Sequence, residues 1–120
     1  MSKADALRLP EYLRHILEAI ERISRYVGDM DEVAFLNDPK TQDAVIRNFE
    51  VIGEASRNIG RYHSQFADEH DYVPLNFAYE MRNALAHGYF KVDLQIVWRT
   101  IHGSLPQLHQ QVRQLLDDME

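Results

Sequence analysis

Residues 12–27, Tyr-Leu-Arg-His-Ile-Leu-Glu-Ala-Ile-Glu-Arg-Ile-Ser-Arg-Tyr-Val, carry the pattern that decides the fold. Their apolar side chains recur at intervals of three and four, which places them on one face of an α-helix. These side chains are Tyr12, Leu13, Ile16, Leu17, Ile20, Ile23 and Val27. Pro10 lies near the expected first turn and Gly28 just past the expected end. The pattern predicts an amphipathic helix that buries one side.

The helical pattern continues outward along the chain. A short helical turn is expected over Asp31 to Leu36. Asp38 and Pro39 then resemble an N-cap and a first helical residue, and they open a second long helix that reaches about Arg61. The polar stretch from Tyr62 to Asp71 is predicted to be a loop.

Two more helices are predicted in the remaining part of the chain. Pro74 opens a shorter helix that runs through His87, where Gly88 can adopt the left-handed conformation that ends a helix. Asp93 caps a final helix, in which Gly103 and Pro106 predict a kink or a short break. Its apolar side is formed by Leu94, Val97, Trp98, Ile101, Leu105, Leu108, Val112, Leu115 and Leu116.

These patterns predict an all-α fold, an antiparallel bundle of four to five helices. With 120 residues, the chain fits a single domain, residues 1–120. No apolar run approaches the roughly 20 residues that a membrane span needs, and the first residues lack the apolar core of a secretory signal. We therefore expect a cytoplasmic protein that does not contact a membrane.

The composition narrows the classes of function. Without cysteine, the chain has no disulfide, no thiol nucleophile and no Cys-ligated zinc. The five histidines outside residue 87 show no zinc-binding spacing, so we expect no metal site and no cofactor. They are His15, His63, His70, His102 and His109. The net charge of −6 argues against a general basic surface for nucleic acid, although a local basic site remains compatible with it.

Six charged residues follow one stripe of the second long helix, at steps of four, three, four, three and four. They are Asp43, Arg47, Glu50, Glu54, Arg57 and Arg61. One interpretation is an ion-pair ladder on a solvated face, in which each pair contributes about 0.2–0.5 kcal/mol. The other is that Glu54 and the arginines border a cleft or a subunit interface. Gly53 and Gly60 lie on the flank of this stripe, where another helix could approach closely.

The segment from Met81 to Phe90 brings together a guanidinium, an amide, an imidazole and a phenol. Asn83 and His87 are four residues apart and share a helix face, whereas Arg82 lies about 140 degrees round the axis from His87. One helix cannot easily direct both Arg82 and His87 at one atom. Either the last turn is distorted or a second copy of the chain completes the site. From spacing alone, a structural role is the favoured interpretation, with His87 capping carbonyls, Arg82 paired with Glu80 or Asp93, and Tyr89 in the core.

These residue types suit the cleavage of an RNA phosphodiester. A 2′-hydroxyl must lose a proton, the phosphorus gains negative charge, and the leaving oxygen must gain a proton. His87 can act as the acid or the base, and Arg82 can stabilise the charge on the phosphate. Each copy supplies only one such histidine, so we expect a symmetric homodimer with this segment at its interface.

Arg82-Asn83, followed by three residues, His87 and then Tyr89, resembles the Arg-Asn-(x)n-His signature of HEPN domains, and specifically of HepT-like toxins. The runs Ala44 to Asn48 and Ile52 to Ala55 resemble the second helix of that family. Val73-Pro74-Leu75-Asn76 departs from the Ile-Pro-Trp of many relatives, a difference that concerns packing more than chemistry.

The resemblance implies a HEPN fold, a homodimer and a metal-independent ribonuclease toxin of a type II or type VII toxin–antitoxin system. It assigns catalysis to Arg82 and His87, with Asn83 and Glu54 in support. It also implies an antitoxin of the minimal nucleotidyltransferase (MNT) type that adenylylates Tyr89, which would block RNA by bulk and charge. Two alternatives stay open: a catalytically silent HEPN dimer that binds a nucleotidyltransferase, and a purely structural helical dimer.

Overall fold

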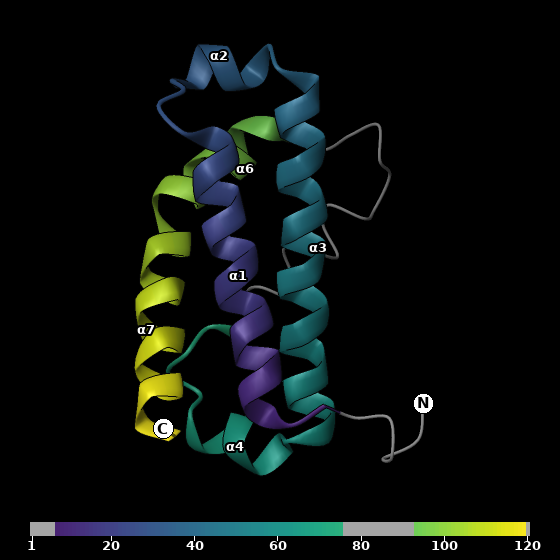
Figure 1. Ribbon diagram of the computed structural model, residues 1–120, viewed down its shortest axis with the longest axis vertical. Coiled ribbons are helices and arrows are strands. Elements are labelled where there is room, and N and C mark those ends of the chain that lie inside the picture. The colour runs from purple at the N-terminus through teal and green to yellow at the C-terminus, as the bar shows by residue number, and fades with distance from the viewer. Residues whose placement is uncertain (1–6, 76–92, 120) are drawn as a thin grey trace.

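The computed structural model describes residues 7–75 and 93–119, and over these residues it forms six helices (Figure 1). They are α1 (Leu9–Val27), α2 (Glu32–Leu36), α3 (Pro39–Tyr62), α4 (Ser64–Glu69), α6 (Leu94–His102) and α7 (Ser104–Met119). The prediction of an all-α bundle is confirmed.

Helix α1 begins and ends where its sequence predicts. Pro10 lies in the first turn, and the carboxylate of Glu11 accepts the backbone N–H of Arg8 at 3.3 Å. At the other end, Gly28 has a φ of 53°, and its N–H donates to the carbonyl of Ser24 at 3.0 Å. A residue with a Cβ adopts that backbone conformation only at a cost, so Gly28 ends the helix.

Aspartates cap the next two helices, and the cap by Asp38 was expected. The carboxylate of Asp31 accepts the N–H of Ala34 at 2.8 Å and starts α2. The carboxylate of Asp38 accepts the N–H of Thr41 at 3.1 Å and the hydroxyl of the same residue at 2.9 Å, which starts α3. Each cap satisfies a donor that the first turn of a helix leaves without a partner.

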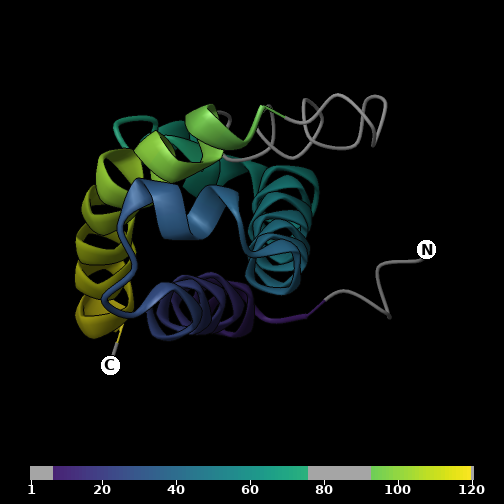
Figure 2. The ribbon, with the colours of Figure 1, turned by 90° about the horizontal axis from the view of Figure 1, so that it is seen from above.

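The three long helices α1, α3 and α7 run side by side, and α1 is antiparallel to both of the others (Figures 1 and 2). The core lies between them and is filled by the apolar faces that the spacing predicts. All seven apolar residues expected on α1 are buried, as are Val45, Phe49, Ile52 and Ile59 of α3 and Val97 of α6. Burial of this apolar surface is the main force that holds the bundle together.

The prediction of a loop from Tyr62 to Asp71 is wrong in its middle, where α4 forms. Phe66 and Ala67 pack against the core, and the ring of Phe66 stacks on that of His70 at 4.0 Å. The N–H of His70 donates to the carbonyls of Phe66 and Ala67, which closes the last turn. Two apolar contacts therefore stabilise one and a half turns of helix in a sequence that is otherwise polar.

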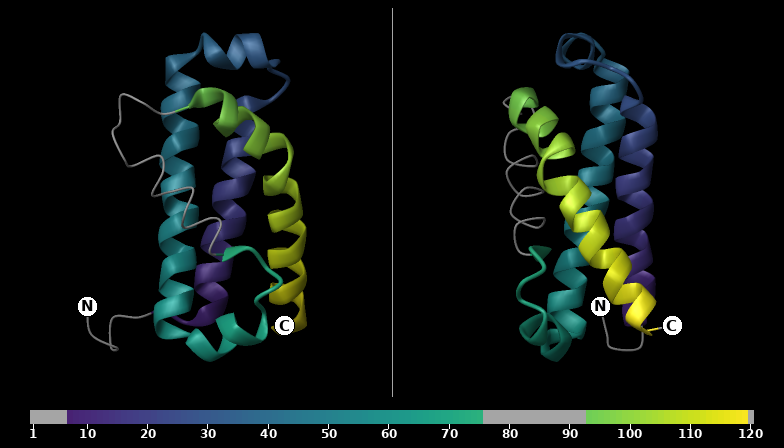
Figure 3. Two further views of the ribbon diagram at one scale, coloured as in Figure 1. Left: turned by 180° about the vertical axis from the view of Figure 1, so that it is seen from behind. Right: turned by 90° about the vertical axis from the view of Figure 1, so that its left-hand side faces the viewer.

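The expected break in the final helix is present at Gly103, between α6 and α7 (Figure 3). The N–H of Gly103 donates to the carbonyl of Arg99 at 2.9 Å and ends α6, after which Ser104 starts α7. A Cβ on Gly103 would lie only 3.0 Å from that carbonyl oxygen, which explains why glycine suits this position. None of the described helices has the length and apolar character that crossing a membrane requires.

Candidate active site

The residues predicted to carry the chemistry, Arg82, Asn83, His87 and Tyr89, lie outside the described residues. The helix predicted from Pro74 through His87 also falls mostly outside them. The assignments to these four side chains therefore remain predictions. The described residues on either side show how both ends of the segment 76–92 are anchored.

The entry to this segment is held by apolar burial. Val73 and Leu75 are both buried in the core. The N–H of Val73 donates to the carbonyl of His70 at 3.0 Å, and the N–H of Leu75 donates to that of Val73 at 2.7 Å. The chain is thus bound to the bundle immediately before residue 76.

The exit is held by a helix cap and by aromatic packing. A carboxylate oxygen of Asp93 accepts the N–H groups of Gln95 at 3.0 Å and Ile96 at 3.2 Å, as expected for the N-cap of α6. Trp98 is half-buried, and its ring centroid lies 5.4 Å from that of Phe35 on α2. This contact fits the expectation that Trp98 packs with the core.

Glu54 is the one predicted site residue that the structure describes. It lies on α3, and its carboxylate is 3.9 Å from the guanidinium of Arg57, with both side chains about half exposed. It lines an open groove of about 320 Å³ between α1 and α3. The groove is also lined by Leu7, Tyr12, His15, Arg47, Glu50, Val51, Ala55 and Asn58. Glu54 and Arg47 therefore border a groove, as one of the two interpretations of the charged stripe expected, whereas Arg57 and Arg61 do not line it.

The other interpretation, an ion-pair ladder, is also visible on α3. Besides Glu54 and Arg57, Arg47 and Glu50 are paired at 3.5 Å. The opposite side of the helix is buried, so the stripe does face outward. Gly53 is buried, but Gly60 is exposed, and a Cβ at Gly60 would meet no atom within 4 Å. No other helix of the described chain approaches Gly60, contrary to what its missing side chain suggested.

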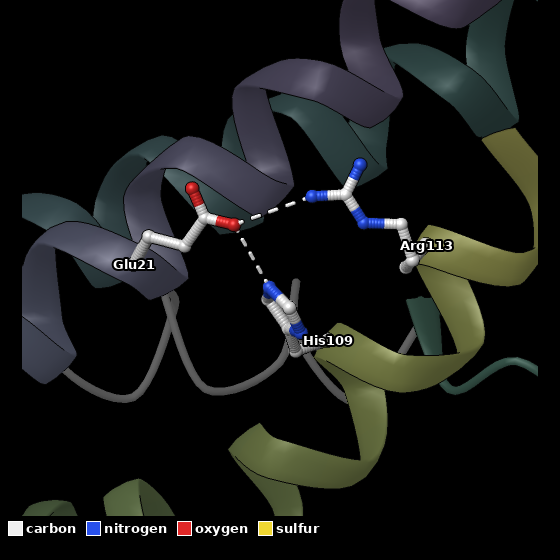
Figure 4. Close-up of polar contacts among 3 residues, drawn as sticks. All are labelled: Glu21, His109 and Arg113. Atoms are coloured by element: carbon white, nitrogen blue, oxygen red, sulfur yellow. Dashed lines mark hydrogen bonds and ion pairs between the residues drawn. The ribbon is translucent and has the colours of Figure 1, made fainter. Parts of the chain in front are cut away.

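A second polar cluster, which sequence reasoning missed, joins α1 to α7. One carboxylate oxygen of Glu21 lies 3.0 Å from Nε2 of His109 and 3.6 Å from the guanidinium of Arg113 (Figure 4). Glu21 and His109 also line a cavity of about 470 Å³ between α1 and the α6–α7 junction. Ile20, Ile23, Ile101 and Leu105 form apolar parts of its lining. The four-residue spacing of His109 and Arg113 is the only sequence signal for this cluster.

Three of the other four described histidines make structural contacts. Nε2 of His63 lies 3.1 Å from the carbonyl oxygen of Leu7, and Nδ1 of His70 lies 2.9 Å from that of Phe66. The ring of His102 packs against Trp98 at 4.2 Å. Within residues 7–75 and 93–119, no three His, Asp or Glu side chains are grouped so that they could hold a metal ion.

A family model described as "Ribonuclease HepT-like" matches residues 16–115. The chain belongs to the HepT-like ribonuclease family. The match spans most of the chain, and it includes Glu54 as well as the predicted site from Arg82 to Tyr89. The resemblance seen in the motif is therefore confirmed by a comparison that extends well beyond the motif.

Related proteins carry ribonuclease names. This HepT-like chain is 42% identical over 98 residues to "Probable ribonuclease HepT" of Thermococcus cleftensis, covering 82% of the chain and 86% of the relative. It is 36% identical over 105 residues to a "Putative RNase" of Caldanaerobacter subterraneus, covering 88% of the chain and 91% of the relative.

A longer relative is the "Gamma-glutamylcyclotransferase and putative RNase" of Methanocaldococcus jannaschii, which is 36% identical over 109 residues. The alignment covers 91% of the HepT-like chain but 48% of that relative, so the chain spans about half of its length. No solved structure matches the chain significantly.

Proposed function

We propose that this HepT-like ribonuclease is a metal-independent endoribonuclease toxin that acts in the cytoplasm as a homodimer. The observation that carries the proposal is family membership over residues 16–115, combined with an intact set of Arg82, Asn83, His87 and Tyr89 within that span. Each of these side chains has a role in RNA cleavage or in its control.

Cleavage proceeds by attack of the ribose 2′-hydroxyl on the adjacent phosphorus. The 2′-oxygen loses its proton and bonds to phosphorus, and the bond from phosphorus to the 5′-oxygen breaks. That oxygen takes up a proton, so the products end in a 2′,3′-cyclic phosphate and a 5′-hydroxyl. Arg82 stabilises the negative charge that develops on the phosphate oxygens.

Proton transfer needs two groups, one to accept and one to donate. A twofold dimer supplies two copies of His87, one for each role. Asn83 is one helical turn before His87 and supports it by holding the imidazole or touching the substrate. Glu54 supports the site from α3.

The partner that silences the toxin is an MNT-type nucleotidyltransferase, which transfers an adenylyl group from ATP to the hydroxyl of Tyr89 and releases pyrophosphate. The bound adenylate places a negative phosphate two residues from His87. It therefore competes with RNA phosphate by both bulk and charge.

The ribonuclease proposal is tested by incubating purified protein with total RNA in EDTA. Arg82→Ala and His87→Ala are compared with the wild type, and His102→Ala serves as the matched control. We expect cleavage by the wild type and by the control alone, with 2′,3′-cyclic phosphate ends. RNA that survives in every sample would refute the enzyme and leave the silent nucleotidyltransferase-binding dimer or the structural dimer.

The antitoxin proposal needs a separate measurement. Co-expression with the neighbouring open reading frame should raise the mass of the chain by adenylyl units, and Tyr89→Phe should abolish the increase. An unchanged mass of the wild type would refute modification while leaving the ribonuclease untouched.

A further inference from the structure

Four of the six charged residues on the outer stripe of α3 follow a simple order. Glu50 and Glu54 come first and Arg57 and Arg61 follow, at steps of four, three and four residues. This spacing places them along one side of the helix. All four keep a substantial exposed surface, which is 48% for the side chains of Glu54 and Arg57. Over residues 50–61 the stripe therefore carries two negative charges followed by two positive charges, and Asp43 and Arg47 precede them on the same stripe.

We infer that α3 pairs antiparallel with α3 of a second copy. The twofold axis that relates the two copies crosses the helix pair at the level of residues 55 and 56. In this register, Glu50 of each copy lies opposite Arg61 of the other, and Glu54 lies opposite Arg57. The inference rests on the proposed homodimer and specifies which surface brings the two copies together.

The order of charges is what selects the antiparallel arrangement. A run of two acids and two bases becomes two bases and two acids when it is reversed, so each carboxylate meets a guanidinium. A parallel arrangement with the same residues opposite one another would place like charges together. The helix dipoles also oppose one another in the antiparallel pair, which is the favourable arrangement.

The contacts within one chain leave these side chains able to bind a partner. Glu50 lies 3.5 Å from Arg47 and Glu54 lies 3.9 Å from Arg57, both beyond the 2.7–2.9 Å of a strong charge-assisted hydrogen bond. The guanidinium of Arg61 lies 5.3 Å above the ring of Tyr62, and within the described chain it makes no ion pair. A second copy can therefore add contacts without breaking a buried network.

The flank of the stripe has room for another helix. A Cβ at Gly60 would meet nothing within 4 Å, and this glycine is exposed one residue before Arg61. A stable interface buries about 800 Å² on each partner, more than three turns of one helix provide. The charged stripe accordingly sets the orientation and register of the two copies. Complementary charges contribute more to the specificity of an interface than to its affinity. Surface beside the stripe supplies the rest of the area.

The inference is tested with two single substitutions, Glu50→Arg and Arg61→Glu. Each variant alone places like charges opposite one another twice in its own dimer. In a heterodimer of the two variants, all four facing pairs join opposite charges. We expect each variant to dimerise at least about tenfold more weakly than the wild type, and the mixture to recover wild-type affinity as a heterodimer.

Dissociation constants are measured by analytical ultracentrifugation, and heterodimers are identified by native mass spectrometry. Glu18→Arg is the matched control, because Glu18 pairs with Arg22 on α1 at 3.9 Å and lies outside the stripe. It makes the same charge change and loses a similar local pair, so it should dimerise like the wild type. Thermal unfolding of every variant shows whether each is folded.

The outcomes separate this inference from the proposed ribonuclease. Variants that dimerise as tightly as the wild type, or a mixture that fails to recover, would overturn the α3 register even if RNA is cleaved. Variants that no longer bind a nucleotidyltransferase but still dimerise would also overturn the α3 register. Dimers that follow the charges without cleaving RNA would uphold the register and refute the enzyme.

Discussion

Nε2 of His109 lies 3.0 Å from a carboxylate oxygen of Glu21, although 88 residues separate them in the sequence. Within the described chain, most of the other ion pairs join residues three or four apart on one helix. The contact between Glu21 and His109 instead joins α1 to α7, and it extends to Arg113.

We expect this contact to contribute modestly to stability. Both side chains keep a third or more of their surface exposed, so solvent screens the interaction. A double-mutant cycle with Glu21→Gln and His109→Gln, measured by urea denaturation, should give a coupling free energy of about 0.2–1 kcal/mol. A coupling of zero would mean that apolar packing alone holds α7 on α1.

The start of α3 should weaken in acid. The backbone N–H of Thr41, and then its hydroxyl, hold the pKa of Asp38 below the ordinary value of 3.8. Because the folded pKa is below the unfolded one, this contact stabilises the protein above the unfolded pKa. The contribution is lost as the pH falls through the folded pKa.

Stability measured by urea denaturation from pH 6 to pH 2 tests this prediction. Asp38→Asn keeps a capping side chain but does not titrate, so the gap between wild type and variant should close as the pH falls below 3.8. Curves that stay parallel across this range would contradict the prediction.

The core of the bundle should tolerate truncation poorly. Ile52 on α3 is 1% exposed, and replacing it with alanine leaves a cavity between α3 and its neighbours. We expect Ile52→Ala to lower the free energy of unfolding by about 2–5 kcal/mol. Val33→Ala is the control, because Val33 is 68% exposed and its loss should change stability by about 0.5 kcal/mol or less.

Alanine should have opposite effects at two glycines. Gly28 has a φ of 53°, so Gly28→Ala should destabilise the protein by about 1–3 kcal/mol. Gly60 lies in α3 with open space around its Cα, so Gly60→Ala should stabilise the chain by about 0.4–1 kcal/mol. Urea denaturation at a low protein concentration measures both effects, and a stabilising Gly28→Ala would contradict the conformational argument.

The fold was largely predictable because its long helices repeat a strong signal. Tyr12 to Val27 on α1 and Val45 to Ile59 on α3 place apolar residues at intervals that only a helix brings to one face. Helix α4 was missed because its stability comes from Phe66 meeting the core and His70, contacts that local spacing does not reveal. Tertiary packing outweighed the polar composition.

The residues of the candidate site could be proposed from the sequence, and their roles and geometry stay predictions. The motif names Arg82 and His87, but the dimer that would unite them is a property of two chains. Glu54 was singled out by its place on a charged stripe, and the structure adds that it borders a groove. The link between Glu21 and His109 could not be foreseen, because nothing in the sequence relates residues 88 positions apart.

The break at Gly103 has a consequence for how relatives of this chain can differ. It frees α6 from the direction of α7, so that α6 rests on α2 through Trp98 and Phe35. The five residues of α2 thereby brace the helix that follows the predicted catalytic segment. An insertion or deletion in the short connection between α1 and α3 would shift that brace. A change in the length of this connection is therefore expected to displace α6, although the connection lies some fifty residues from His87 in the sequence.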